Sequence, residues 1–290
     1  MGKVNGIYRW IRLSAHSLKR LFFKAQATII IPTYGNARFA RWTIDSVRGQ
    51  TVKNIEISII CDGSPPEMLA FFDDFAKIDP RISVFSFPKS ERTGEPYRDE
   101  IIRTKARGKY IFYCSHDDLW LPGHVEEIIK LLKDFEFGHS LHAELSPGRR
   151  ETNGGDFFKT INYADMQDPV CREKMLNEKT PFNYFGLTFA AHTKNSYLKL
   201  NKGWATTPKG IWTDLYMWRK FLSAYGEHSG TLKKITALHF PAYERTNMSV
   251  QERDGELAFY YKKVLEPGFA QKVNEIACRT VPELSSFAVP

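Results

Sequence analysis

The sequence has few cysteines and no long apolar run. Its four cysteines lie far apart in 290 residues and form no Cys-x-x-Cys pair, which excludes a zinc ribbon and a disulfide scaffold. No stretch reaches the roughly 18 consecutive apolar residues that a membrane-spanning helix needs. Apolar residues make up 42% and charged residues 26% of the chain, as in a folded globular protein. We therefore expect a soluble protein of a reducing compartment, with one large domain or two smaller ones.

Two phosphate-binding motifs are also missing. No Gly-x-Gly-x-x-Gly follows the first strand-like run, and no Gly-x-x-x-x-Gly-Lys-Ser/Thr occurs anywhere. Dinucleotide oxidoreductases and P-loop nucleotide hydrolases depend on these glycine-rich loops. Both classes of enzyme therefore lose their main support, and any nucleotide has to be held in another way.

Positive charge is concentrated at the start of the chain. Of the 41 lysines and arginines behind the net charge of +8, six lie in residues 1–26, where no acidic residue occurs. The apolar residues of this arm recur at the spacing of one helix face: Ile7, Trp10, Ile11, Leu18, Leu21 and Phe22. A basic amphipathic helix of this kind either lies on an anionic membrane surface or packs on its own domain, and both interpretations remain open. The rest of the chain is nearly neutral and has no basic stripe with interleaved aromatics, so no nucleic-acid partner is expected.

Strand-like and helix-like segments alternate regularly between residues 27 and 134. The expected strands are Ala27–Ile31, Ile55–Cys61, Ile82–Phe87 and Lys109–Cys114. The expected helices are Asn36–Gln50, Met68–Ile78, Glu95–Arg107 and Gly123–Asp134. The first strand is expected to stop at Pro32. This alternation predicts an α/β fold with a Rossmann-like, mostly parallel sheet and helices on both faces.

The regular alternation ends after residue 134. Residues 145–184 are rich in Gly, Asn, Asp and Pro, so we expect a flexible loop or a small subdomain there. Further along, the pattern predicts a helix near Ile211–Tyr225, a strand over Leu232–Phe240 and one closing helix over Gly255–Ile276.

Polar residues follow three of the expected strands. They are Pro32–Asn36, Asp62–Ser64 and Ser115–Asp118, and the carboxyl ends of parallel strands are where open α/β sheets bind ligands. The adjacent carboxylates of Asp117 and Asp118 raise one another's pKa unless a cation or hydrogen-bond donors compensate. Their oxygens suit magnesium or manganese. The alternative is that both residues only cap the helix that begins near Pro122.

Five motifs follow one another between residues 27 and 135. They are Ile29–Tyr34, Ile44–Val47 with Gln50–Thr51, Asp62–Ser64, Gly108–Ile111 and Asp117–Pro122. In order and spacing this series resembles glycosyltransferase family 2, the inverting enzymes of the GT-A fold. Each motif alone is weakly specific, but the series is specific.

The resemblance implies a nucleotide-sugar donor, usually a UDP-sugar, and a saccharide or lipid-linked glycan as acceptor. The implied donor-binding residues are Pro32, Thr33, Tyr34, Asp62 and Asp117. Asp118 would bind a Mn²⁺ or Mg²⁺ ion that bridges the diphosphate. By analogy, the setting is bacterial polysaccharide or lipopolysaccharide assembly. We expect the protein in the cytoplasm, at the inner face of the cell membrane if the basic arm is an anchor.

A second signature of the family is matched by Gly210–Arg219. Inverting transfer needs a general base to take the proton of the acceptor hydroxyl, and we assign that role to Asp214. Trp212, Tyr216 and Trp218 could offer apolar faces to a sugar, and Trp212 is the predicted acceptor contact. In the alternative interpretation Asp214 or its neighbour Thr213 only caps the helix and the aromatic residues belong to the core.

Five further side chains have two interpretations each. Arg98, in the helix before the fourth strand, either reaches the base or a phosphate or is an exposed helix residue. His192 and His239 are each a third metal ligand or a structural histidine. Arg245 and Arg253 either contact the diphosphate or are solvated surface residues.

Two residues depart from the family pattern. Ser115 stands where the metal-binding loop usually has its first acid, and Cys61 replaces the first aspartate of the usual Asp-Asp-Gly-Ser. Fewer carboxylates mean weaker metal binding. These departures support the alternative function, a catalytically silent nucleotide- or glycan-binding module of the same fold.

The predicted organisation has four parts. Residues 1–26 form the basic arm, and residues 27–144 the nucleotide-sugar-binding half. Residues 145–250 form the acceptor-binding half, and residues 251–290 a C-terminal helical segment. The predicted activity is metal-assisted inverting transfer of a sugar, as in a hexosyltransferase, with Asp214 as the base.

Overall fold

The computed structural model describes residues 25–148 and 158–287. The predicted amphipathic helix of residues 1–26 lies outside this part of the chain except for its last two residues. Within the described residues, no helix is both long and apolar enough to cross a membrane.

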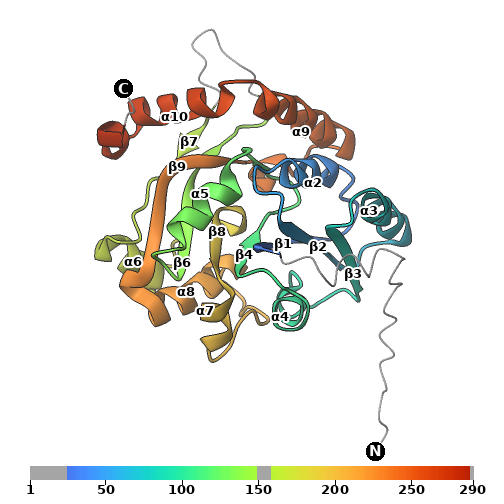
Figure 1. Cartoon of the computed structure of the whole chain (residues 1–290), viewed down its shortest axis with the longest axis horizontal. Helices are drawn as coiled ribbons and strands as arrows, with labels where there is room; N and C mark the ends of the chain where they lie inside the picture. Colours follow the sequence, from blue (N-terminus) through green and yellow to red (C-terminus); the bar gives the residue numbers. More distant parts are fainter. Residues whose placement is uncertain (1–24, 149–157, 288–290) are drawn as a thin grey trace, which may run out of the picture.

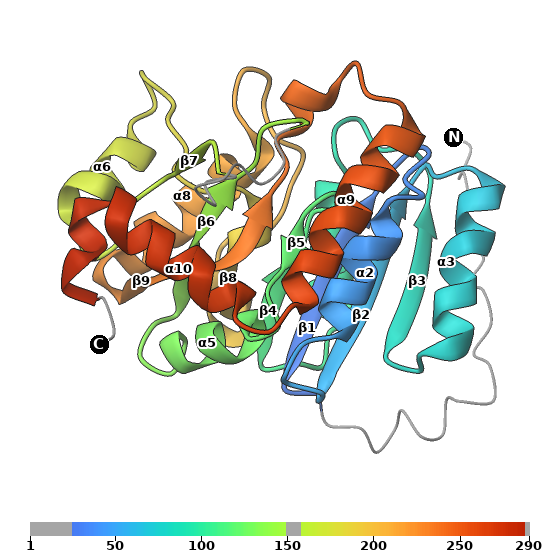
Figure 2. The same cartoon turned by 90° about the horizontal axis from the view of Figure 1, so that it is seen from above.

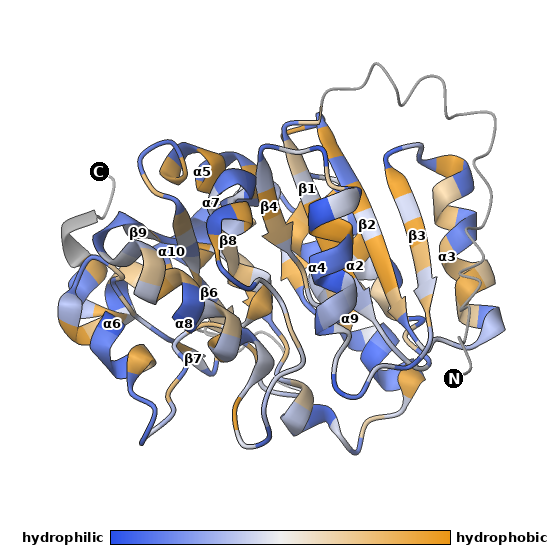
Figure 3. Cartoon of the chain, turned by 90° about the horizontal axis from the view of Figure 1, so that it is seen from below, coloured by the Kyte–Doolittle hydropathy of each residue, from blue (hydrophilic) through white to orange (hydrophobic). Residues whose placement is uncertain are grey.

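One nine-stranded sheet runs through the described chain in the order β3-β2-β1-β4-β8-β6-β9-β5, with β7 beside β6 (Figure 1). Its first four strands are β1 (Ala27–Thr33), β2 (Ile55–Asp62), β3 (Ile82–Phe87) and β4 (Tyr110–Tyr113). The pairings among these four strands are all parallel. β1 and β2 are buried along nearly their whole length, and Figure 3 shows hydrophobic residues concentrated on these strands. The predicted α/β fold is confirmed.

β1 continues to Thr33 and does not stop at Pro32 as predicted. The pairing with β4 ends at Ile30, opposite Tyr113, and on the other side β1 stays in register with β2 up to Thr33. Because β4 has already ended, the missing N–H of Pro32 removes no hydrogen bond on that side of the ladder. The strand therefore carries Pro32 and Thr33 to the carboxyl edge of the sheet.

The second half of the sheet is mixed. It contains β5 (Leu119–Trp120), β6 (Phe137–Glu144), β7 (Thr160–Ile161), β8 (Ala190–Thr193) and β9 (Ser229–His239). β8 is antiparallel to β4 and to β6, and β9 is parallel to β6 and antiparallel to β5. Neither β6 nor β8 was expected, because the sequences FGHSLHAE and AAHT show neither an apolar run nor clear alternation.

Helices cover both faces of the sheet (Figures 1 and 2). On one face lie α2 (Ala40–Arg48), α9 (Val250–Leu265) and α10 (Phe269–Thr280), and on the other lie α4 (Glu95–Thr104), α7 (Lys194–Lys199) and α8 (Thr213–Tyr225). α3 (Pro66–Ile78) packs along β3, α5 (His124–Leu131) packs against β9, and α6 (Pro169–Leu176) packs against α8. The region of residues 145–184 thus contains regular elements, β7 and α6, within its described part.

The predicted single closing helix is two helices, α9 and α10. The chain between them contains Pro267, whose nitrogen cannot donate a helix hydrogen bond. Gly268 follows with φ +80°, a left-handed conformation that glycine adopts without steric cost. The apolar spacing continues across this break, which is why the sequence pattern alone predicts one helix.

Candidate functional site

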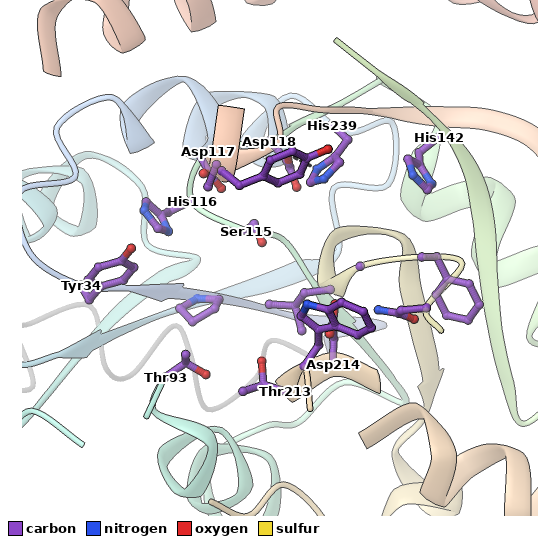
Figure 4. A pocket seen from close by; sticks show the side chains of 18 of the residues that line it. Tyr34, Thr93, Ser115, His116, Asp117, Asp118, His142, Thr213, Asp214 and His239 are labelled. Atoms are coloured by element: carbon purple, nitrogen blue, oxygen red, sulfur yellow. Dashed lines mark hydrogen bonds and ion pairs between the residues drawn. The ribbon is translucent and has the colours of Figure 1, made fainter. Parts of the chain in front are cut away.

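A cleft of about 640 Å³ lies at the carboxyl ends of β1, β2 and β4 and extends to the ends of β6 and β9. Nine of the residues suggested for the site line it: Pro32, Thr33, Tyr34, Asp62, Arg98, Asp117, Asp118, Trp212 and Asp214. Figure 4 shows Asp117, Asp118 and His239 along one wall and Asp214 on the opposite wall. The fold therefore brings side chains from both halves of the sheet to one cavity.

Both carboxylate oxygens of Asp118 accept hydrogen bonds from the protein. It is 1% exposed. Its Oδ1 accepts hydrogen bonds from His239 Nδ1 at 3.0 Å and from the Phe240 N–H at 2.9 Å, and its Oδ2 accepts one from the Thr188 hydroxyl. Burial acts to raise the pKa of Asp118, but the His239 charge and these hydrogen bonds outweigh it and lower the pKa. Asp118 is thus held as an anion.

Two histidines lie beside Asp118. Burial acts to lower the pKa of His239, but the charge of Asp118 outweighs it and raises the pKa above its usual value. His142 on β6 stacks on Phe189 with ring centroids 3.9 Å apart, and burial lowers its pKa well below the usual value. His142 is therefore a neutral neighbour of the His239–Asp118 pair.

Asp117 pairs with a residue far along the chain. Its Oδ2 accepts a hydrogen bond from the Arg253 guanidinium on α9 at 2.9 Å, and both side chains are largely buried. Arg253 also lies over the Phe39 ring, 4.7 Å from its centroid.

α5 begins at His124 without a side-chain cap, so the interpretation of Asp117 and Asp118 as helix caps is wrong. The solvated-surface interpretation of Arg253 is wrong as well.

Asp62 is held by the loop after β3. Its carboxylate accepts hydrogen bonds from Lys89 Nζ at 2.7 Å, from the Ser90 hydroxyl at 2.9 Å and from the Ser90 N–H at 2.5 Å. Asp62 is 3% exposed and lines the cleft. The protein therefore already occupies much of its hydrogen-bonding capacity, and little remains for a ligand.

Arg98 is buried, so the exposed-helix interpretation is wrong. It is 4% exposed, and its guanidinium lies over the Trp204 ring, 4.8 Å from its centroid. One terminal nitrogen donates to the Thr93 carbonyl at 2.6 Å, while Nε and the other terminal nitrogen have no hydrogen-bond partner. Burial lowers the pKa of Arg98. A buried cation with unsatisfied donors suits an anionic ligand.

Asp214 lies in the first turn of α8. The N-cap position of this helix is Trp212, and no side chain caps the helix with a hydrogen bond. Neither Thr213 nor Asp214 is the cap, so that alternative is wrong. Asp214 Oδ1 accepts a hydrogen bond from the Leu215 N–H at 2.8 Å. Burial raises the pKa of Asp214, which makes its carboxylate a stronger base.

The aromatic residues near Asp214 divide into rim and core. Trp212 is 57% exposed and lines the cleft, whereas Trp218 is completely buried among Tyr113, Phe137 and Trp204. The suggestion that Trp218 faces a sugar is therefore wrong. Helical spacing alone does not distinguish the two tryptophans.

Two other suggested ligands belong to the core. His192 is fully buried on β8 and shares a hydrogen bond of 2.8 Å with the Tyr113 hydroxyl, so it is structural. Arg245 is 1% exposed and makes two hydrogen bonds, of 2.6 and 2.8 Å, to the Glu256 carboxylate. Arg245 is neither a surface residue nor part of the cleft lining.

The two departures from the family pattern differ in their consequences. Cys61 is completely buried, it is not part of the cleft lining, and burial raises the pKa of its thiol to about 11. Ser115 does line the cleft, and its N–H donates to the Thr188 hydroxyl at 3.0 Å. Only the change at Ser115 therefore removes a carboxylate from the cavity.

Several cleft residues were not predicted. His116 stacks on Phe39, with ring centroids 5.6 Å apart, and meets Tyr34 edge-on. The others include Arg92, Thr93, His142, Glu144, Asn162 and Asn183. Thr188, which bonds Asp118 from outside the lining, was not predicted either. His116 lies within the acidic motif and could have been selected from it, but the others come from segments without a recognisable pattern.

The side chains of the cleft can be compared with the ligands that a divalent metal needs. No group of three or more His, Cys, Asp or Glu side chains suited to a metal occurs in residues 25–148 and 158–287. Asp118 and His239 nevertheless lie side by side and provide two possible metal ligands. A Mg²⁺ or Mn²⁺ site that shares one or two protein ligands with substrate phosphates needs no more than that. The cleft thus fits a metal that binds together with a diphosphate.

The family model described as glycosyl transferase family 2 matches residues 28–189, more than half of the chain. The chain belongs to glycosyltransferase family 2. GlyA of Streptococcus pneumoniae, a glycosyltransferase, is 28% identical over 170 residues, which are 56% of this chain and 23% of GlyA. An uncharacterized glycosyltransferase of Rickettsia bellii is 28% identical over 160 residues, 54% of this chain and 22% of that protein. This family 2 chain therefore spans about a quarter of the length of these two relatives.

The similar solved structures include S. aureus TarS 1–349, with a TM-score of 0.54 and 12% identity over 83% of this chain and 69% of that one. The same protein in complex with UDP-GlcNAc has a TM-score of 0.52 and 14% identity over 86% and 76% of the two chains. At this level of identity the similarity shows the fold alone. This family 2 chain has the GT-A fold.

Proposed function

We propose that this chain transfers a sugar from a nucleoside-diphosphate donor, a UDP-sugar, to a hydroxyl of a saccharide or lipid-linked glycan, with inversion at the anomeric carbon. The observation that carries the proposal is the position of Asp214 across one cleft from Asp117 and Asp118. In this proposal Asp214 is the general base and acts from the side opposite the residues predicted to hold the donor.

Each part of the cleft then has a chemical task. Tyr34, which is 59% exposed, offers a ring face to the nucleobase of the sugar donor. The Arg98 nitrogens that lack hydrogen-bond partners are directed at the nucleotide. Asp118 and His239 would hold the Mn²⁺ or Mg²⁺, which neutralises charge on the diphosphate when bound. The hydrogen bond from Thr188 fixes the Asp118 side chain before any ligand binds. The Asp118 carboxylate therefore needs no reorganisation on binding.

Asp214 carries out the proton transfer. Its carboxylate takes the proton of the acceptor hydroxyl as that oxygen forms a bond to the anomeric carbon. The bond from this carbon to the donor diphosphate breaks on the opposite face, and the diphosphate leaves with the electron pair. Trp212 on the rim offers an apolar face to the acceptor sugar.

The direct test combines binding with turnover. UDP is titrated calorimetrically into the wild type with manganese and with chelator, and UDP-sugars are then incubated with the enzyme without an acceptor. We expect metal-dependent UDP binding and slow donor hydrolysis. Binding without hydrolysis would favour the second candidate, a silent module. That candidate is supported by the engagement of Asp62 and Asp118 with protein donors.

In this proposal the parts of the chain have separate roles. Residues 27–144 bind the donor and residues 145–250 the acceptor. The helical segment of residues 251–290 contributes Arg253 to the donor side. The setting is assembly of bacterial surface polysaccharide, in the cytoplasm.

The basic arm is proposed as a peripheral anchor on the inner face of the cell membrane. Deleting residues 1–26 is expected to abolish sedimentation with anionic vesicles, because each basic residue near such a surface contributes about 1 kcal/mol. Calorimetric titration with UDP should show unchanged donor binding. Equal sedimentation of the truncated protein would rule out the anchor.

Arg253→Ala is expected to weaken UDP binding on the order of tenfold, since it removes a charged partner from the largely buried Asp117. Arg253→Lys should restore most of the affinity, because a single guanidinium nitrogen makes the contact. In turnover assays KM for the donor should rise while kcat changes little. Lys262→Ala, on the exposed side of the same helix, is the control, and an equal loss in the Lys variant would contradict a positioning role for Arg253.

A further inference from the structure

Charge is distributed unequally along the cleft. The two lining arginines are Arg92, which donates to the carbonyls of Pro208 and Ile211, and Arg98, which donates to the Thr93 carbonyl. Lys89 and Arg253 pair with Asp62 and Asp117. We call the part of the cleft formed by Glu144, Asn162, Asn183, Tyr184, Trp212 and Tyr243 the acceptor half. None of the described residues that line the acceptor half is a lysine or an arginine.

Glu144 sets the charge of the acceptor half. It lies at the end of β6, opposite His239 in the sheet register, and its carboxylate accepts a hydrogen bond of 3.4 Å from the Asn162 amide. Lys159 and Lys174 flank this region without lining it. Lys159 pairs with Glu244 and donates to the Tyr243 hydroxyl at 3.3 Å. Lys174 lies over the Phe182 and Tyr184 rings, 3.9 and 5.1 Å from their centroids. The described lining thus carries the carboxylates of Glu144 and Asp214, while the neighbouring His239 is already paired with Asp118.

The other groups of the acceptor half are neutral and polar or aromatic. Asn183 has a side-chain oxygen without a hydrogen-bond partner, and a ligand hydroxyl seated beside it would supply the missing donor. Trp212 and Tyr243 are 57% and 67% exposed and offer flat apolar faces at the rim. Amide groups between aromatic faces suit a ring that carries hydroxyls on its edge and C–H groups on its faces.

We infer that the acceptor half binds an uncharged saccharide unit and discriminates against acceptors that carry a carboxylate or phosphate beside the reacting hydroxyl. An anion there would face Glu144 and Asp214 in a partly dehydrated cleft, where like charges repel strongly. This inference rests on the proposed function and adds the chemical class of the acceptor.

The test uses pairs of probes that differ only in charge. Methyl β-glucoside and methyl β-glucuronide form one pair, and methyl β-galactoside and methyl β-galacturonide the other. Each is titrated into the full chain saturated with UDP and manganese. We expect at least one neutral member to bind roughly tenfold more tightly than its acid. Glu144→Gln should bring this ratio close to one, and Asn183→Ala should weaken the neutral glycoside about tenfold.

Two exposed residues outside the cleft lining, Glu173 and Asn201, provide the controls Glu173→Gln and Asn201→Ala, which should change neither value. UDP titration of every variant reports whether its fold is intact. Equal or tighter binding of the acids, an unchanged ratio in Glu144→Gln, or no binding of either neutral glycoside while UDP binds would overturn the inference. Failure of UDP to bind the wild type would instead refute the proposed function.

Discussion

Asp214→Asn is expected to slow sugar transfer by a factor of about 10² to 10⁴ while the affinity for UDP stays close to that of the wild type. The amide keeps the size of the carboxylate and its hydrogen bond from Leu215, but it cannot take the proton of the acceptor hydroxyl. Donor hydrolysis in water should fall with transfer if the same base activates both nucleophiles.

The measurement is kcat and KM with a fixed UDP-sugar and a transfer acceptor, together with calorimetric titration of UDP. Asp214→Glu should retain part of the activity, because a carboxylate remains in the cleft. Asp134→Asn, at an exposed position after α5, is the matched control. A variant Asp214→Asn with wild-type turnover would assign the base to another residue.

Asp118→Asn is expected to lower the affinity for UDP in the presence of manganese by about 100-fold and to remove the difference between manganese and chelator. The second effect is more diagnostic, because a general loss of fold would weaken both titrations. An asparagine still accepts the hydrogen bond from the Phe240 N–H, so the loop should stay in place.

A melting curve of Asp118→Asn separates binding from stability. The substitution removes the anion that faces His239 and Thr188, and we expect a loss in the free energy of unfolding of about 1–3 kcal/mol. Asp117→Asn serves as comparison, because it changes the neighbouring carboxylate but should preserve the metal dependence. Metal-dependent UDP binding in Asp118→Asn would show that the ion is held elsewhere.

The first half of the fold could be predicted because its signals are local. Ala27–Thr33 and Ile55–Asp62 are isoleucine-rich runs buried between layers, and the helices after them have clear apolar faces. In the second half, β6 is buried through His139 and His142, which stack on Phe185 and Phe189. A hydropathy pattern cannot reveal that a histidine is buried by ring stacking, because histidine counts as polar.

The same difference applies to the candidate site. The residues that follow β1, β2 and β4 were located from their motifs, and Asp214 from the resemblance of Gly210–Arg219 to a second signature of the family. Arg253 and Asn183 were not assigned to the site, because each reaches it through tertiary packing. A lone arginine or asparagine in a polar segment has no sequence context that distinguishes a cleft residue from a surface one.

The hydrogen bonds of Asp118 also determine when the cleft can be completed during synthesis. Its partners Thr188, His239 and Phe240 are encoded 70, 121 and 122 residues later, and the Arg253 that pairs with Asp117 comes 136 residues after it. A nascent chain that ends between residues 240 and 253 therefore contains the partners of Asp118 but still lacks the partner of Asp117. α9 has to be synthesised before the charged residues of the nucleotide pocket are all paired. Fragments truncated before α9 should therefore be unable to use the sugar donor.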